Sequence, residues 1–91
     1  MPILIDVRAL SAYSSKVSPR AITVFLFLAS IAEAETRTCS PRIQWIAEQL
    51  GVGRGVVSSA IRELKQQGMI HVEAQRDVDH GIGPNRYTLI I

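Results

Sequence analysis

The most constraining feature of this sequence is a pair of amphipathic helical patterns joined by a very short turn that contains glycine. Apolar residues recur at helical spacing on both sides of the turn, as Ile43, Ile46, Ala47 and Leu50 and then as Val57, Ala60, Ile61 and Leu64. Gly51 stands where a helix commonly ends in the left-handed conformation. Two helices joined so closely must cross, and the small Ala47 allows a close crossing. Residues 43–70 therefore predict two helices locked through one shared core.

A long apolar helix is expected before this unit. Ser18 suits the N-cap and Pro19 the first helical position, and the helix should run to about Glu35. It carries two apolar stripes, one of Ile22, Phe25, Leu26 and Ala29 and the other of Val24, Phe27, Leu28 and Ile31. A helix so apolar must be covered on more than one side. We expect the first stripe in the core. The second lies in the core too, under the N-terminal segment, or at the interface of a homodimer.

Short strands are expected around the two crossing helices. Residues 36–39 suit a short strand, and Ser40-Pro41 repeats the cap signal before the helix over 41–50. The next helix should cover 54–67 and end at Gly68.

The pattern then changes to that of a hairpin. Residues 69–72 and 86–91 read as strands, and the polar residues 77–83 read as the tip between them. The order predicts an α+β, mostly helical fold over residues 18–91, a winged helix-turn-helix with a three-helix core and a β-hairpin wing. Residues 1–17 form an N-terminal segment, a short strand near 3–7 or a helix over 6–13, that could act as a dimerisation arm.

The composition fits one small domain with no catalytic or metal site. The chain has 91 residues, 47% of them hydrophobic, and its net charge of +2 permits a nucleic-acid partner without requiring one. The longest apolar run, residues 21–32, is shorter than the roughly 20 residues of a membrane span, and no signal peptide is evident, so we expect a cytoplasmic protein. Cys39 is the only cysteine and suits a partly buried apolar position. Asp77, Asp79 and His80 lack the ligand pattern of a calcium or zinc site. We expect no enzyme, no cofactor and no small-molecule effector.

Residues 50–64, followed by Gly68-Met69-Ile70, resemble the recognition-helix signature of bacterial winged-helix regulators, including those of the GntR type. Residues 38–41 and 83–87 are similar to small helix-turn-helix domains of plasmid and phage replication and regulatory proteins. The resemblance covers about residues 18–91 and implies a winged-helix fold that binds duplex DNA.

The helical period predicts which residues face the DNA. With the apolar residues inward, the outward positions near the start of the second crossing helix are Arg54, Gly55, Ser58, Ser59 and Arg62. The N-terminal part of such a helix enters the major groove, where arginine reads guanine or holds a phosphate. Arg42 should lie near the phosphate backbone. The hairpin adds Arg76, Asn85 and Arg86 as wing contacts, although Asp77 and Asp79 would repel phosphate.

These expectations favour a transcriptional regulator that represses as a homodimer by occupying an operator. Two copies on a repeated half-site would raise affinity and specificity. Two alternatives remain open from the sequence. One is a plasmid or phage protein of replication or partition, and the other is a winged-helix module that binds proteins rather than DNA.

Overall fold

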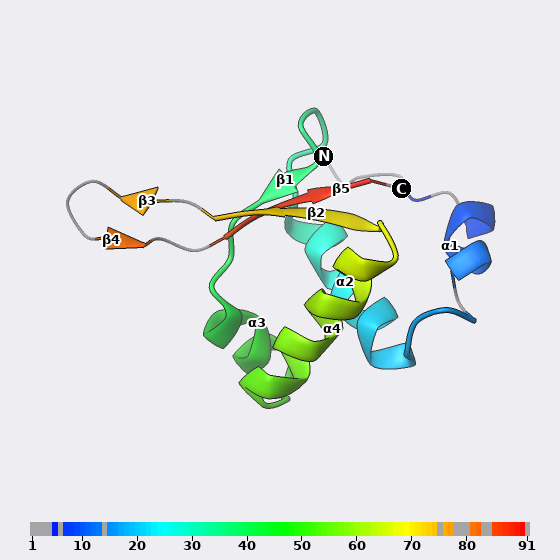
Figure 1. The fold of residues 1–91 in the computed structure, drawn as a ribbon, viewed down its shortest axis with the longest axis horizontal. Coiled ribbons are helices and arrows are strands. Elements are labelled where there is room, and N and C mark those ends of the chain that lie inside the picture. Colours follow the sequence, from blue (N-terminus) through cyan, green and yellow to red (C-terminus); the bar gives the residue numbers. More distant parts are fainter. Residues whose placement is uncertain are drawn as a thin grey trace.

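The structure, a computed structural model, describes residues 5, 7–13, 15–74, 76–77, 81–82 and 85–90. Its helices are α1 (Val7–Tyr13), α2 (Pro19–Ile31), α3 (Ile43–Leu50) and α4 (Arg54–Gln66). Its strands are β1 (Thr38–Cys39), β2 (Ile70–Glu73), β3 (Arg76–Asp77), β4 (Gly81–Ile82) and β5 (Arg86–Leu89). This order confirms the predicted α+β fold, with α2, α3 and α4 as the three-helix core and a β-hairpin wing (Figure 1).

The strands form a small antiparallel sheet in the order β1-β5-β2. β5 is central, because Thr38 of β1 pairs with Thr88 and Val72 of β2 pairs with Tyr87. β3 and β4 form a separate two-stranded ladder. This ladder extends the hairpin away from the helices (Figure 1). The hairpin from β2 to β5, residues 70–89, is the wing.

The core lies where α4 packs against α2, α3 and β2. Every one of these elements, and β5, contributes to it. The largest fully buried side chains are Val24, Phe25 and Leu28 of α2, Ile46 of α3, Val57 and Leu64 of α4, Met69, and Tyr87 and Leu89 of β5. Burial of these side chains is the main favourable contribution to the stability of the fold.

The start of α2 is tied to α4 by a hydrogen-bonded clamp. Ser18 is the N-cap, as predicted, and its Oγ accepts a hydrogen bond from the Ala21 N–H at 3.2 Å. The same hydroxyl donates to Glu63 Oε2 at 2.8 Å, and the Ser18 N–H donates to Glu63 Oε1 at 3.0 Å. Glu63 is half-buried. We call this pair, Ser18 and Glu63, the clamp.

α2 ends at Ile31, four residues earlier than predicted. A tight turn follows, in which the Arg37 N–H donates to Glu33 O at 2.7 Å and the Glu33 N–H donates to Thr38 O at 2.9 Å. Arg37 adopts a left-handed backbone conformation (φ +59°), which reverses the chain into β1. Within the described part of the chain, no helix has both the length and the apolar character to cross a membrane.

The division of α2 into a core stripe and an interface stripe is wrong in part. Val24 and Leu28, predicted at a dimer interface, are 2% and 0% exposed, whereas Leu26, predicted in the core, is 44% exposed. The reason is that the core-facing direction of α2 lies between the two stripes and takes side chains from both. Of the four predicted interface residues, Phe27 is half-buried and Ile31 is exposed, so only these two retain accessible surface.

α3 begins two residues later than the Ser40-Pro41 signal predicts. Arg42 is the N-cap, with an extended backbone (φ −74°, ψ 143°), and its side chain makes no capping hydrogen bond. The first intrahelical bond runs from the Ile46 N–H to Arg42 O at 3.1 Å. Pairing with β5 keeps the chain extended through Cys39, so the residues after it must turn toward α3 before a helix can start.

The N-terminal residues adopt the helical alternative, as α1. The strand considered near residues 3–7 lies mostly outside the described residues. Leu10 and Tyr13 of α1 are partly buried against the core. Figure 1 shows α1 at the end of the molecule opposite the β3–β4 ladder.

The clamp generates a prediction about stability. Replacing Glu63 by alanine leaves the Ser18 N–H and hydroxyl without their charged acceptor, so we expect the free energy of unfolding to fall by about 1–3 kcal/mol. Urea denaturation followed by circular dichroism measures this. Gln66→Ala, at an exposed site on the same helix, is the control and should change stability by less than about 0.5 kcal/mol. A Ser18→Ala/Glu63→Ala cycle with a coupling energy below about 0.3 kcal/mol would contradict the clamp.

Candidate nucleic-acid interface

A glycine turn sets the angle between α3 and α4. Gly51 caps α3 in the left-handed conformation (φ +68°), as predicted, and any side chain there would strain the backbone. The Gly51 and Val52 N–H groups both donate to Ala47 O, the latter at 3.0 Å. Ala47 is itself buried, so its small side chain permits a close approach of α4. Residues 43–66 therefore form the predicted helix-turn-helix.

The packing of α4 divides it into an inner and an outer face. The inner side chains are buried and are those of Val57, Ala60, Ile61 and Leu64. The outer face, exposed throughout, carries the predicted residues Arg54, Gly55, Ser58, Ser59 and Arg62. Gly53, the N-cap, provides no side-chain cap, so no capping side chain covers the first turn. Between its two arginines the outer face carries only a glycine and two serines. Because these side chains are small, the helix backbone can approach another surface closely.

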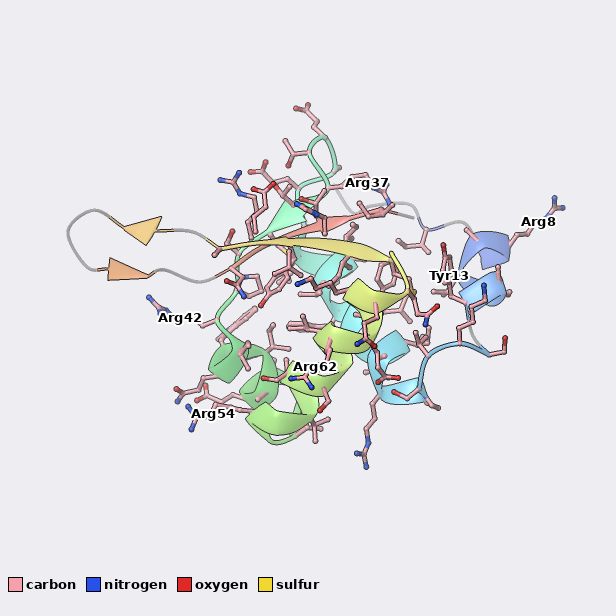
Figure 2. The ribbon with its side chains drawn as sticks, viewed as in Figure 1. Arg8, Tyr13, Arg37, Arg42, Arg54 and Arg62 are labelled. Atoms are coloured by element: carbon pink, nitrogen blue, oxygen red, sulfur yellow. The ribbon has the colours of Figure 1, made fainter. Side chains whose placement is uncertain are left out.

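The arginines of the described residues differ in how they are paired. Arg42, Arg54 and Arg62 are exposed and form no hydrogen bond or ion pair with the described residues. By contrast, Arg37 Nε donates to Leu89 O at 3.2 Å. In Figure 2, Arg42 and Arg54 lie on the side from which the wing projects, and Arg8 lies at the opposite end. Unpaired cations are thus gathered around the helix-turn-helix.

The predicted wing residues are engaged within the protein to different degrees. The Asn85 side chain hydrogen-bonds Tyr87. Arg86 Nη1 lies 3.9 Å from Glu73 Oε2, a solvent-exposed pair of small energetic weight. Arg76 is placed only by its backbone, in β3, and its side chain lies outside the described residues, as do Asp79 and His80. At the base of the wing, Arg86 is therefore exposed for a contact with DNA, whereas the Asn85 side chain is already engaged with Tyr87.

A shallow hollow separates the wing from α3. It brings together two predicted DNA contacts, because Arg42 and Arg86 both line it. Trp45 of α3 lines it as well. Trp45 is 41% exposed and packs against Phe27, with ring centroids 5.5 Å apart and planes at 49°. One part of the Trp45 ring therefore packs within the protein, and the rest is exposed.

A second hollow runs along the other side of α4. It is lined by Ser18, Pro19 and Arg20 of the α2 end and by Gly55, Val56, Ser59, Ala60 and Glu63 of α4. Gly55 and Ser59 belong to the outer face, so this hollow opens beside the predicted DNA-facing residues. Arg20 was not among the sequence candidates. Its place depends on how α2 packs on α4, which no local pattern reveals.

Two titratable groups lie under the first hollow. Burial raises the pKa of the Cys39 thiol to about 11, and its Sγ lies 3.9 Å from Leu28 O. Burial also raises the pKa of Tyr87, helped by the nearby Cys39 and opposed by the hydrogen bond with Asn85. Both groups are therefore uncharged near neutral pH and fit the structural role that the sequence predicts for Cys39.

Comparison with known proteins gives two matches. A family model described as a helix-turn-helix domain matches residues 17–70. Among solved structures, the chain is similar to the adhesin competence repressor of Streptococcus pyogenes, with a TM-score of 0.53 and 17% sequence identity. The match covers 90% of this chain and 53% of the repressor, so this chain spans about half of that protein's length. At this identity the likeness shows a shared winged-helix fold. No curated protein matches.

The buried thiol yields a prediction about reactivity. Because the pKa of Cys39 is raised from 9.0 to about 11, the folded protein holds about 100-fold less thiolate at pH 8 than the unfolded chain. Iodoacetamide labelling, followed by mass spectrometry, should be slower by at least that factor in the folded state. Equal labelling rates with and without denaturant would contradict it. Since the thiol binds its proton more tightly when folded, stability should fall as pH rises from 9 to 11.

Proposed function

Because this chain belongs to the helix-turn-helix domain family, we propose that it is a sequence-specific regulator of transcription that binds double-stranded DNA and represses by occupying an operator. Family membership supports a DNA-binding regulator rather than an enzyme, since this motif presents a helix to the major groove. The observation that carries the proposal is the outer face of α4, where Arg54 and Arg62 are exposed and unpaired within the described residues.

The N-terminal half of α4 enters the major groove in this proposal. Ser58 and Gly55 are small, so the helix axis can approach the base edges closely. Arg54 and Arg62, one on each side of these residues in the sequence, then reach guanine O6 and N7 or an adjacent phosphate. No internal ion pair among the described residues has to break before either arginine binds.

The phosphate backbone is held by residues beside α4. Arg42 is at the N-cap of α3, where the first helix of the motif crosses the backbone. Arg86, at the start of β5 and the base of the wing, adds a second cation for the phosphate backbone. Phosphate contacts fix the position of the protein on DNA, and base contacts in the groove then select the sequence.

Homodimerisation completes the proposal. Phe27 packs on Trp45, and Trp45 lines the first hollow together with Ile31. These three residues form a partly exposed apolar surface, which we call the α2–α3 surface. Burying it against a second copy would remove apolar area from water and would place two recognition helices on one operator.

The first test is DNA binding by the Arg54→Ala/Arg62→Ala variant. Loss of two phosphate or base contacts should lower the affinity for duplex DNA at least about tenfold and reduce the salt slope of log K by up to about 1.8. Fluorescence anisotropy with a labelled duplex across a salt series measures both.

Arg8→Ala/Lys16→Ala removes the same charge away from the motif and is the control. It should bind within about twofold of wild type, since neither residue contacts DNA in this arrangement. Failure of the wild-type chain to bind any duplex at low salt would overturn the proposal and favour a protein-binding role.

The second test concerns the α2–α3 surface. Ile31→Glu places a charge in the proposed interface, so the dimer dissociation constant should rise by at least about 100-fold. Light scattering coupled to size exclusion reads the change in mass. Leu26→Glu, at another exposed apolar site of α2, should leave the dimer intact. If Ile31→Glu and Phe27→Asp both stay folded and dimeric, this surface is not the interface.

A further inference from the structure

We propose that Arg20, on the first turn of α2, binds a phosphate of the DNA strand on the side of α4 away from the wing. This inference rests on the proposed function and deepens it. It adds a second helix to the DNA-binding surface and a residue that the sequence pattern does not single out.

The position of Arg20 is fixed by the second hollow. One wall of that hollow is the start of α2, with Arg20, and the other is the outer flank of α4, with Gly55 and Ser59. A DNA strand that passes close to Gly55 and Ser59 therefore also passes the mouth of this hollow. In Figure 1 the start of α2 lies on the side of α4 opposite α3 and the wing.

The charge of Arg20 is available for such a contact. Arg20 is exposed and forms no hydrogen bond or ion pair with the described residues. The acidic neighbour in the hollow is Glu63, and the clamp already engages both of its oxygens, at 3.0 and 2.8 Å from Ser18. The Glu63 carboxylate thus faces the α2 N-cap, and Arg20 is left to bind an anion from outside. The α2 N-terminus itself is occupied by Ser18 and Glu63 and supplies no separate site.

The dimensions of DNA place a phosphate strand along each flank of a recognition helix. A helix with its side chains is about 10–12 Å across and the major groove is about 12 Å wide, so α4 fills the groove and a phosphate strand runs along each flank. Arg42 and Arg86 lie on the flank next to α3 and the wing. On the other flank, Arg20 is the cationic side chain that lines the described hollow.

The experiment compares Arg20→Ala with wild type on two duplexes. One has random sequence, and the other is the tightest-binding duplex that wild type selects from a random library. Loss of one phosphate contact should reduce the salt slope of log K by about 0.9, so the affinity gap between wild type and variant narrows about threefold from 50 to 200 mM salt. The reduction should be the same on both duplexes, because a phosphate contact carries no sequence information.

Two variants act as matched controls. Lys16→Ala removes one positive charge just before α2, at a residue that lies 5.6 Å from the Tyr13 ring and outside the hollow, and should leave the slope unchanged. Arg20→Lys keeps the charge and should retain most of the slope. Circular dichroism confirms that each variant is folded.

The outcomes separate this inference from the function on which it rests. Suppose that Arg20→Ala keeps the wild-type salt slope of log K while Arg54→Ala/Arg62→Ala binds DNA more weakly. That result overturns the role of Arg20 and leaves the proposed function standing. A larger loss on the selected duplex than on the random one overturns the phosphate assignment, because it indicates a base contact. Absence of wild-type binding to both duplexes overturns the proposed function, and this inference with it.

Discussion

Burial of one face of α4 is the constraint on which the rest of this structure depends. Val57 and Leu64 are fully buried, and Ala60 and Ile61 nearly so, between α2, α3 and β2. Successive helical residues are about 100° apart, so a shift of one residue in this packing would carry an arginine toward the core. The outer face is therefore positioned by hydrophobic burial. Its arginines need no partners within the protein, and this leaves their charge free for a ligand.

Two local devices hold α4 at a fixed angle. The left-handed Gly51 sets the turn before it, and the clamp ties Glu63, in its C-terminal half, to the start of α2. The clamp has an electrostatic consequence as well. Glu63 is close in sequence to Arg62, and an outward carboxylate would repel phosphate. The clamp instead engages both oxygens of that carboxylate at the positive end of the α2 dipole, which offsets part of its repulsion of a phosphate near the outer face.

Sequence periodicity predicted the parts of the fold that depend on local pattern. It located α4, its inner face, the Gly51 turn and the Ser18 cap, because each follows from residue spacing or from a single conformational preference. It misjudged features that depend on tertiary contacts. Val24 and Leu28 are buried because the side of α2 that faces the core lies between its two apolar stripes. The positions of Glu63 and Arg20 depend on how α2 packs against α4, which no pattern within either helix reveals. On the wing, the sequence predicted Asn85 as a DNA contact, but its side chain forms a hydrogen bond with Tyr87.

The size of the recognition surface bears on how a protein of this kind reaches specificity. On the outer face of α4, Arg54 and Arg62 are the long polar side chains, and the exposed residues between them are short. A well-formed bidentate base contact contributes about 1–3 kcal/mol of discrimination, so two of them select weakly against a genome of competing sites. Phosphate contacts from Arg42, Arg86 and Arg20 would raise affinity for every sequence alike. The proposed homodimer would add selectivity, because a second copy on an adjacent half-site doubles the number of base contacts that a correct site has to satisfy.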